Sequence, residues 1–294
     1  METKNRLRYF FDAVEHCEMC GSDSDLHKNL GQRLNRSQGR DTKNKPGISV
    51  TIFKCMRCEL IFTSPQPVPF DINDHYGLPP EEYWHSDDFQ WEPEYFADQI
   101  STAKQLLPFN AGMSALDIGA GLGKGMKSLE KAGFDTYGFE PSEPFFARAI
   151  DKMGIDRSKI KLGMIEEMDY DGECFDFITF GAVLEHLYHP AYSIELAMRW
   201  LKPNGIVHIE VPYSNHLISR IANMAYKLKG TSFVTNTSPM HPPFHLYEFG
   251  LKSFEELGKK LAFTIEKKHH DVCEIFFVPK ILQPFFRKYM EVTN

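Results

Sequence analysis

Long apolar runs are missing from this chain. No segment approaches the eighteen or so consecutive apolar residues that a membrane-spanning helix needs. The first ten residues, METKNRLRYF, also lack the apolar core of a secretory signal peptide. The hydrophobic and charged fractions, 42% and 25%, are those of an ordinary globular protein. We therefore expect a cytoplasmic protein without a membrane span.

An excess of positive charge is missing as well, since the formal net charge is −7. This balance argues against nucleic-acid binding over the whole surface, which requires a broad basic face. One segment is nevertheless basic: residues 21–54 contain seven lysines and arginines against three aspartates. This segment is either a solvated loop or a binding site for an anionic partner such as a diphosphate or RNA.

Cysteine is sparse, and four of the six cysteines fall in two C-x-x-C pairs, Cys17 with Cys20 and Cys55 with Cys58. Each pair can supply two thiolates from one tight turn, and two such turns complete the tetrahedral coordination sphere of Zn²⁺. The alternatives are a redox pair, a disulfide framework or a coincidence of spacing. Redox pairs of this kind accompany a strand–helix–strand unit, and disulfides accompany export. The spacing therefore favours a structural zinc site.

A glycine-rich turn follows an apolar segment in the middle of the chain. Residues 114–118 are strand-like, residues 124–132 are helix-like, and the glycines lie between them. Glycine lets the backbone turn tightly and approach a ligand without a Cβ in the way. Glu140, at the end of the next apolar segment, can accept hydrogen bonds from both hydroxyls of a ribose. Together these features predict a pocket for a nucleotide-containing cofactor.

The spacing of the glycines separates two classes of cofactor. A dinucleotide fingerprint, G-x-G-x-x-G, would place its third glycine at position 124, which is Lys124. The glycines fall instead at every second position from 119 to 125, and Asp117 precedes them. This D-x-G-x-G-x-G pattern resembles motif I of the class I S-adenosylmethionine-dependent methyltransferases. A nicotinamide-dependent oxidoreductase is the weaker hypothesis, and a purely structural turn is the remaining alternative.

Other segments resemble this family in the order in which the family has them. Residues 175–180 read as a buried strand, and the following GAVLEHL is similar to the LEHL signature after the family's fourth strand. The turn LKPNG at 201–205 is similar to the LKPGG turn that precedes the fifth strand. The resemblance implies an α/β fold with a seven-stranded, doubly wound, Rossmann-like sheet, to which a small N-terminal zinc ribbon is added.

The resemblance also implies how the cofactor is held. Asp117 and the glycine turn would face the methionine part of S-adenosylmethionine, and Glu140 would hold the ribose. Met164 stands where the family usually has a polar residue beside the adenine, so backbone groups or Glu166 would make that contact. The predicted cofactor-binding residues are Asp117, Gly119, Ala120, Gly121, Gly123, Glu140, Pro141, Ile165, Glu166 and Gly181.

Aromatic residues are concentrated in residues 70–109, ahead of motif I. Elements at this place in the family commonly cover the cofactor. Tyr76 or Tyr83 could therefore lie against the sulfonium, whose positive charge is attracted to a ring face. The alternative is that these rings pack between the two parts of the molecule.

The binding site for the molecule that accepts the methyl group is expected in the insertion at 212–250, because the family often builds this site after the fifth strand. His241 and His245 lie there, in a run resembling one seen in small-molecule methyltransferases. An imidazole titrates near neutral pH and could take the proton of the acceptor. His186, after the fourth strand, is the third candidate for acceptor contact or general base. Each histidine could instead fix a loop or pack against the cofactor turn.

These segments divide the chain into four expected parts, the third of which carries an insertion. They are a zinc-binding module with the basic insertion (1–68), an aromatic-rich helical cap (69–112), an S-adenosylmethionine-binding domain (113–280) with its substrate-side insertion (212–250), and a C-terminal tail (281–294). Within the tail, residues 281–290 are expected to form a docking helix, although they could also touch a membrane or partner.

The resemblance implies methyl transfer from S-adenosylmethionine to a small molecule, with a sugar or a nucleotide-linked sugar as the first acceptor to consider. One alternative is an RNA methyltransferase that uses the zinc module and the basic loop. The other is a non-catalytic protein that binds the cofactor or acts as a scaffold.

Overall fold

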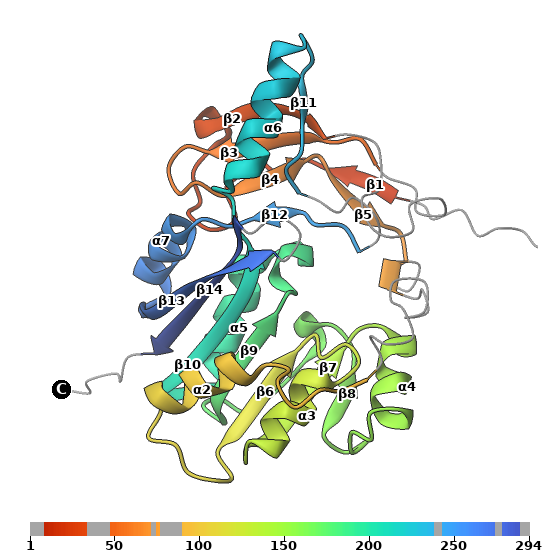
Figure 1. Ribbon diagram of the computed structural model, residues 1–294, viewed down its shortest axis with the longest axis vertical. Coiled ribbons are helices and arrows are strands. Elements are labelled where there is room, and N and C mark those ends of the chain that lie inside the picture. Colours follow the sequence, from red (N-terminus) through yellow and green to blue (C-terminus); the bar gives the residue numbers. More distant parts are fainter. Residues whose placement is uncertain are drawn as a thin grey trace, which may run out of the picture.

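The computed structural model describes residues 9–33, 48–71, 75–76, 90–237, 243–273 and 278–288. A seven-stranded sheet lies at its centre, in the order β13-β14-β10-β9-β6-β7-β8 (Figure 1). The parallel strands are β6 (Ser114–Ile118), β7 (Asp135–Glu140), β8 (Ile160–Leu162), β9 (Phe175–Gly181) and β10 (Leu201–Pro212). Strand β14 (Val278–Lys288) runs antiparallel to both of its neighbours, β10 and β13 (Phe263–Cys273). The predicted fold class is confirmed.

Helices cover both faces of this sheet, and successive residues of its inner strands supply the two cores. On one face, Phe177 and Ile206 pack with α2 (Ala97–Leu106) and α3 (Lys124–Lys131). On the other face, their neighbours Ile178 and Val207 pack with α5 (Pro190–Trp200) and α7 (Leu251–Leu261). The inner strands are buried on both sides, so their sequences read as continuous apolar runs. Helix α4 (Glu143–Asp151) lies beside α3.

A smaller, five-stranded sheet lies above the first in Figure 1, in the order β11-β2-β3-β4-β12. Its inner strands are N-terminal: β2 (His27–Arg33), β3 (Thr51–Cys55) and β4 (Ile61–Ser64). Its two edge strands, β11 (Phe233–Val234) and β12 (Tyr247–Glu248), belong to the insertion at 212–250. The N-terminal module and the insertion therefore share one sheet. A two-stranded sheet of β1 (Tyr9–Asp12) and β5 (Gln66–Pro69) adjoins it.

The insertion also carries helix α6 (Leu217–Leu228), which projects at the top of Figure 1 and packs on β11. Its exposed apolar side chains, Leu217, Ile221, Met224 and Leu228, recur at helical spacing along one face. Within the described residues, no helix is both long enough and apolar enough to cross a membrane.

The prediction of a docking helix over 281–290 is wrong. Residues 281–288 belong to β14, the antiparallel strand between β10 and β13, and residues 289–294 lie outside the described residues. Leu282, Phe285 and Phe286 are buried there. A strand that is buried on both faces gives a short apolar run, and periodicity alone does not distinguish such a run from a helix. The C-terminal tail predicted from residue 281 is corrected accordingly.

Candidate functional site

A pocket of about 430 Å³ opens at the carboxyl ends of β6, β7 and β9. Ligands of doubly wound α/β folds bind at this edge of the sheet, because the loops that follow the strands converge there. The glycine turn, the end of β7 and the loop after β9 line the pocket from one side, and Pro243 and His245 line it from the insertion.

The first three glycines of the turn have different surroundings although all three are left-handed. Gly119, Gly121 and Gly123 have φ angles of 67°, 55° and 80°. A Cβ at Gly119 would come within 2.6 Å of a Val183 methyl carbon, and one at Gly123 within 2.7 Å of Ile155. A Cβ at Gly121 would meet nothing within 4 Å. Gly121 therefore leaves space for a ligand, whereas the other two allow close packing of the chain.

Glu140 links the glycine turn to the end of β7. Its Oε2 accepts a hydrogen bond from the Gly121 N–H at 2.8 Å, and its Oε1 accepts one from the Ser142 N–H at 2.9 Å. The side chain is only 7% exposed, and burial raises its pKa to about 7. A carboxylate oxygen can accept more than one hydrogen bond, so the group can still receive two ribose hydroxyls. The residues present fit the ribose of S-adenosylmethionine.

Asp117 lies behind the pocket and is absent from its lining. Its carboxyl is buried under the start of α3, where a Cβ at Gly125 would meet Oδ2 at 2.6 Å. Burial, with a further contribution from the charge of Glu140, raises the pKa of Asp117 to about 7. Asp117 thus holds the turn against the helix. Gly123 is also absent from the lining.

The other predicted cofactor residues lie around the pocket: Gly119, Ala120, Gly121, Glu140, Pro141, Ile165, Glu166 and Gly181. Met164 lines it as well, and the Met164 N–H donates to the Glu167 carboxylate at 2.9 Å. That hydrogen bond caps the N-terminus of the short helix η4 (Ile165–Glu167). Ile165 and Glu166 of this helix line the pocket.

Some lining residues were not predicted. Tyr95, Lys124 and Phe145 line the pocket, and the Lys124 ammonium lies 5.7 Å from the centre of the Tyr95 ring. Lys124 directly follows the glycine turn and Tyr95 belongs to the aromatic segment, so position in the sequence could have indicated both. Tyr76, one of the two tyrosines expected at the sulfonium, lines the pocket, whereas Tyr83 lies outside the described residues.

Two of the three candidate histidines meet at the far side of the pocket. His186 and His245 both line it, and their ring centres lie 4.7 Å apart in an edge-to-face arrangement. The Nδ1 atom of His186 lies 3.0 Å from the carbonyl oxygen of Phe244. Since a carbonyl only accepts, Nδ1 carries the hydrogen of this contact, which assigns Nε2 as the ring nitrogen that can accept a proton. His241 lies outside the described residues.

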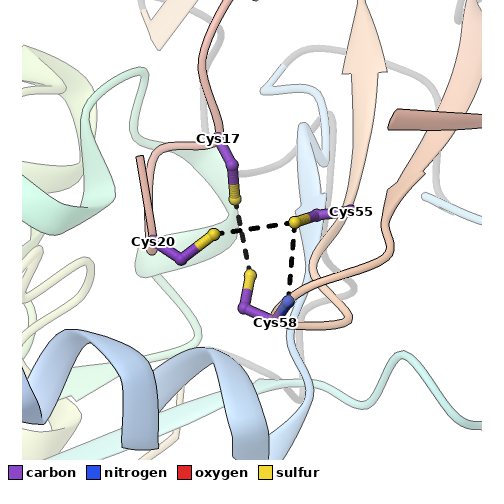
Figure 2. A group of neighbouring side chains, drawn as sticks. All are labelled: Cys17, Cys20, Cys55 and Cys58. Carbon is purple, nitrogen blue, oxygen red and sulfur yellow. Dashed lines mark hydrogen bonds between the residues drawn. The ribbon is translucent and has the colours of Figure 1, made fainter. Parts of the chain in front are cut away.

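The side chains of the four paired cysteines point toward one another at the end of β3, as Figure 2 shows. All four are buried, and their sulfur atoms lie within 4.8 Å of one another. The Sγ atoms of Cys17 and Cys58 are 3.4 Å apart, and those of Cys20 and Cys55 are 3.6 Å apart. A tetrahedral zinc ion with Zn–S bonds of about 2.3 Å places its sulfurs about 3.8 Å apart. The donor set and its dimensions fit Zn²⁺.

The two cysteine turns have the same backbone form. The residue after each pair, Gly21 or Glu59, is left-handed, with φ angles of 70° and 68°. In each turn its N–H donates to the carbonyl of the first cysteine, at 2.7 and 2.9 Å. Hydrogen bonding from the Cys17 thiol lowers the pKa of Cys58 to about 6. The same contact, together with burial, raises the pKa of Cys17. Within this pair one sulfur therefore holds the proton and the other is a thiolate, the form that binds metal.

A family comparison decides the class of the protein. Residues 90–268, more than half of the chain, match the model of a methyltransferase domain family. The chain belongs to this family. This match confirms the predicted family and enzyme class, and it supports S-adenosylmethionine as the cofactor.

Two curated relatives share the methyltransferase domain at moderate identity. The mitochondrial ubiquinone biosynthesis O-methyltransferase of Mus musculus is 30% identical over 34% of this chain and 28% of its own length. The ubiquinone biosynthesis O-methyltransferase of Bradyrhizobium diazoefficiens is 31% identical over 33% of this chain and 38% of its own length. The matched segment thus spans well under two thirds of either relative.

Solved structures share the fold of the methyltransferase domain. The YcgJ protein of Bacillus subtilis superposes with a TM-score of 0.50 at 15% identity, over 68% of this chain and all of that one. An S-adenosylmethionine-dependent methyltransferase of Methanosarcina mazei gives the same TM-score and identity, over 64% of this chain and 97% of that one.

Proposed function

We propose that this protein transfers the methyl group of S-adenosylmethionine to a small molecule bound beside His186 and His245. The observation that carries the proposal is one continuous pocket that joins Glu140 and the glycine turn to these two histidines. A volume of about 430 Å³ suits a small ligand better than a polymer. The names of the two curated relatives, ubiquinone biosynthesis O-methyltransferases, also support an acceptor of this size.

The residues of the pocket have three tasks in this reaction. S-adenosylmethionine supplies a methyl group already activated by its sulfonium, so the protein has chiefly to bind, align and exclude water. Glu140 would hold the ribose, and Tyr76 and Tyr95 would attract the positive charge with their rings. The Nε2 lone pair of His186 gives the acceptor side a group that can accept a proton or hold the acceptor.

The acceptor is proposed to be a hydroxylated small molecule, with sugars and nucleotide-linked sugars tested first and phenols second. The RNA hypothesis depends on the basic insertion, of which residues 34–47 lie outside the described residues, and it stays a prediction.

We also propose that Cys17, Cys20, Cys55 and Cys58 hold a structural Zn²⁺, which would stabilise the small sheet.

Calorimetric titration of zinc-quantified protein with S-adenosylhomocysteine and, separately, with NADH tests the cofactor part. We expect S-adenosylhomocysteine alone to bind, at one molecule per chain. Folded, zinc-containing protein that does not bind it would make the non-catalytic hypothesis the better one.

Formation of S-adenosylhomocysteine from S-adenosylmethionine, measured against a panel of sugars, nucleotide sugars and phenols, tests the acceptor part. Turnover that depends on one of these classes is the expected result. If only RNA supports turnover, and its binding weakens steeply with salt, the small-molecule proposal fails.

A further inference from the structure

A buried carboxylate lies next to the two histidines of the pocket. Glu185 and His186 belong to the short helix η5 (Leu184–His186) after β9, and His245 precedes β12. One ligand atom from each of the three side chains, a carboxylate oxygen or a ring nitrogen, lies within 4.8 Å of the other two. Two segments about sixty residues apart are thus brought together at one point.

Glu185 is the unusual member of this group. Its side chain is 2% exposed, and its Oε2 atom has no hydrogen-bond partner among the residues that the structure describes. Leaving a carboxylate oxygen buried and unpaired is costly, so such an atom normally binds a proton or a cation. The Glu185 carbonyl accepts a hydrogen bond from the Leu246 N–H at 2.8 Å, which fixes this backbone against the neighbour of His245.

His186 is oriented as a metal ligand would be. Its Nδ1–H donates to the Phe244 carbonyl at 3.0 Å, which leaves Nε2 as the coordinating atom. Metal-bound histidines almost always donate their other ring N–H to a carbonyl or carboxylate in this way. Both histidines line the pocket, so an ion held here would keep coordination positions open toward the acceptor.

We propose that Glu185, His186 and His245 form a second metal site, separate from the four-cysteine cluster, which binds a divalent transition-metal ion. One carboxylate oxygen and two imidazole nitrogens suit Zn²⁺, Mn²⁺, Fe²⁺ or Co²⁺ better than Ca²⁺ or Mg²⁺. The histidines then serve as ligands rather than as the base.

The site also narrows the acceptor class, in a step that rests on the proposed function. Open positions on the ion would take oxygen atoms of the acceptor. A molecule with two adjacent hydroxyls, which can occupy two such positions, is therefore the preferred acceptor.

Cobalt titration tests the site directly. Tag-free protein whose cysteine cluster is filled with zinc is titrated with Co²⁺ by calorimetry, and zinc release is followed at the same time. We expect one Co²⁺ per chain to bind without loss of zinc. Glu185→Gln should weaken this binding by more than about tenfold, and His245→Ala should do the same.

The matched control is Glu248→Gln. Glu248 is also buried and lies three residues from His245, but its oxygens already accept hydrogen bonds from Asn236 and Thr237. The Glu248→Gln protein should bind Co²⁺ with the same affinity as the unchanged protein. Three results would each overturn the proposal. The first is that no Co²⁺ binds. The second is that Co²⁺ binds only as zinc is released and a sulfur-to-cobalt absorption band appears, and the third is that Glu185→Gln binds Co²⁺ as tightly as the unchanged protein.

S-adenosylhomocysteine titration of the same samples separates this inference from the proposed function. A Glu185→Gln protein that binds S-adenosylhomocysteine normally is folded at the pocket, so its loss of Co²⁺ is attributable to the missing ligand. Protein that binds S-adenosylhomocysteine but no Co²⁺ contradicts the metal site alone. Protein that binds Co²⁺ but not S-adenosylhomocysteine contradicts the methyltransferase proposal and leaves the metal site standing.

Discussion

Gly119 and Gly121 occupy the same turn, yet an added methyl group meets different surroundings at each. Alanine at either position is strained by about 1–2 kcal/mol, because both residues are left-handed. Gly121→Ala adds a Cβ in open space, so we expect a small loss of stability and a large loss of cofactor affinity. Gly119→Ala forces its Cβ to within 2.6 Å of Val183, so its melting temperature should fall further.

Thermal unfolding and titration with S-adenosylhomocysteine check this pair of variants together, each serving as the control for the other. The assignment of Gly121 to the cofactor would be refuted if Gly121→Ala bound S-adenosylhomocysteine as tightly as the unchanged protein.

The raised pKa of Glu140 predicts that cofactor affinity depends on pH. Below the pKa of about 7 the carboxyl holds a proton, and one of its oxygens is less able to accept a ribose hydroxyl. The affinity for S-adenosylhomocysteine should therefore be highest above pH 7 and fall below it, by at most about tenfold per pH unit. Calorimetry between pH 5.5 and 8.5 measures this.

Glu140→Gln removes the titrating group and keeps the shape of the side chain. This variant should bind S-adenosylhomocysteine more weakly at pH 8 and with little dependence on pH. A pH dependence of the same size in the variant would assign the titration to another group, such as the neighbouring Asp117, whose pKa is also about 7.

At the scale of elements, the two cysteine turns should depend on zinc to keep their form. Cys55 ends β3 and is buried with its three partners, so Cys55→Ser leaves an incomplete donor set. We expect zinc content to fall below one per chain and the melting temperature to fall, because metal binding contributes directly to folding. Cys174→Ser is the control, since Cys174 lies outside the cluster. Equal zinc in both variants would contradict the site.

Elements with strong local signals were predictable from the sequence. The glycine turn, the strands around it and the cysteine pairs each combine a periodic pattern with residues of special conformation. The strands β11 and β12 have two residues each and exist only because they pair with β2 and β4. Such pairing is tertiary, so no local pattern indicates it.

The residues of the pocket were also only partly predictable from the sequence. Residues near the glycine turn follow from motif spacing, and so does the choice of His186 and His245 as candidates. Their contact with each other, and with the buried Glu185, depends on how the insertion folds back. The buried position of Asp117 behind the turn was equally hidden, because spacing does not tell on which side of a strand end a carboxylate lies.

Over the whole molecule, contacts join the small sheet to the methyltransferase domain at several points. Ser253 of α7 donates to the Cys58 carbonyl at 2.9 Å, and Arg57 pairs with Glu256 at 3.1 Å. The Tyr188 hydroxyl, in the loop after η5, donates to the Pro67 carbonyl at 2.8 Å. Because the edge strands β11 and β12 come from the insertion of the methyltransferase domain, the small sheet is complete only together with that domain. We therefore expect a single cooperative unfolding transition.

Tryptophan fluorescence tests this cooperativity, because residues 1–68 contain no tryptophan, while Trp200 is buried in the methyltransferase domain. Removal of zinc by a strong chelator should lower the melting temperature seen by fluorescence as much as that seen by far-ultraviolet circular dichroism. The reason is that a cooperative unit loses stability as a whole when one part loses its ligand. Two transitions, with the fluorescence transition unmoved by chelation, would mean that the small sheet unfolds independently and that its contacts with α7 contribute little.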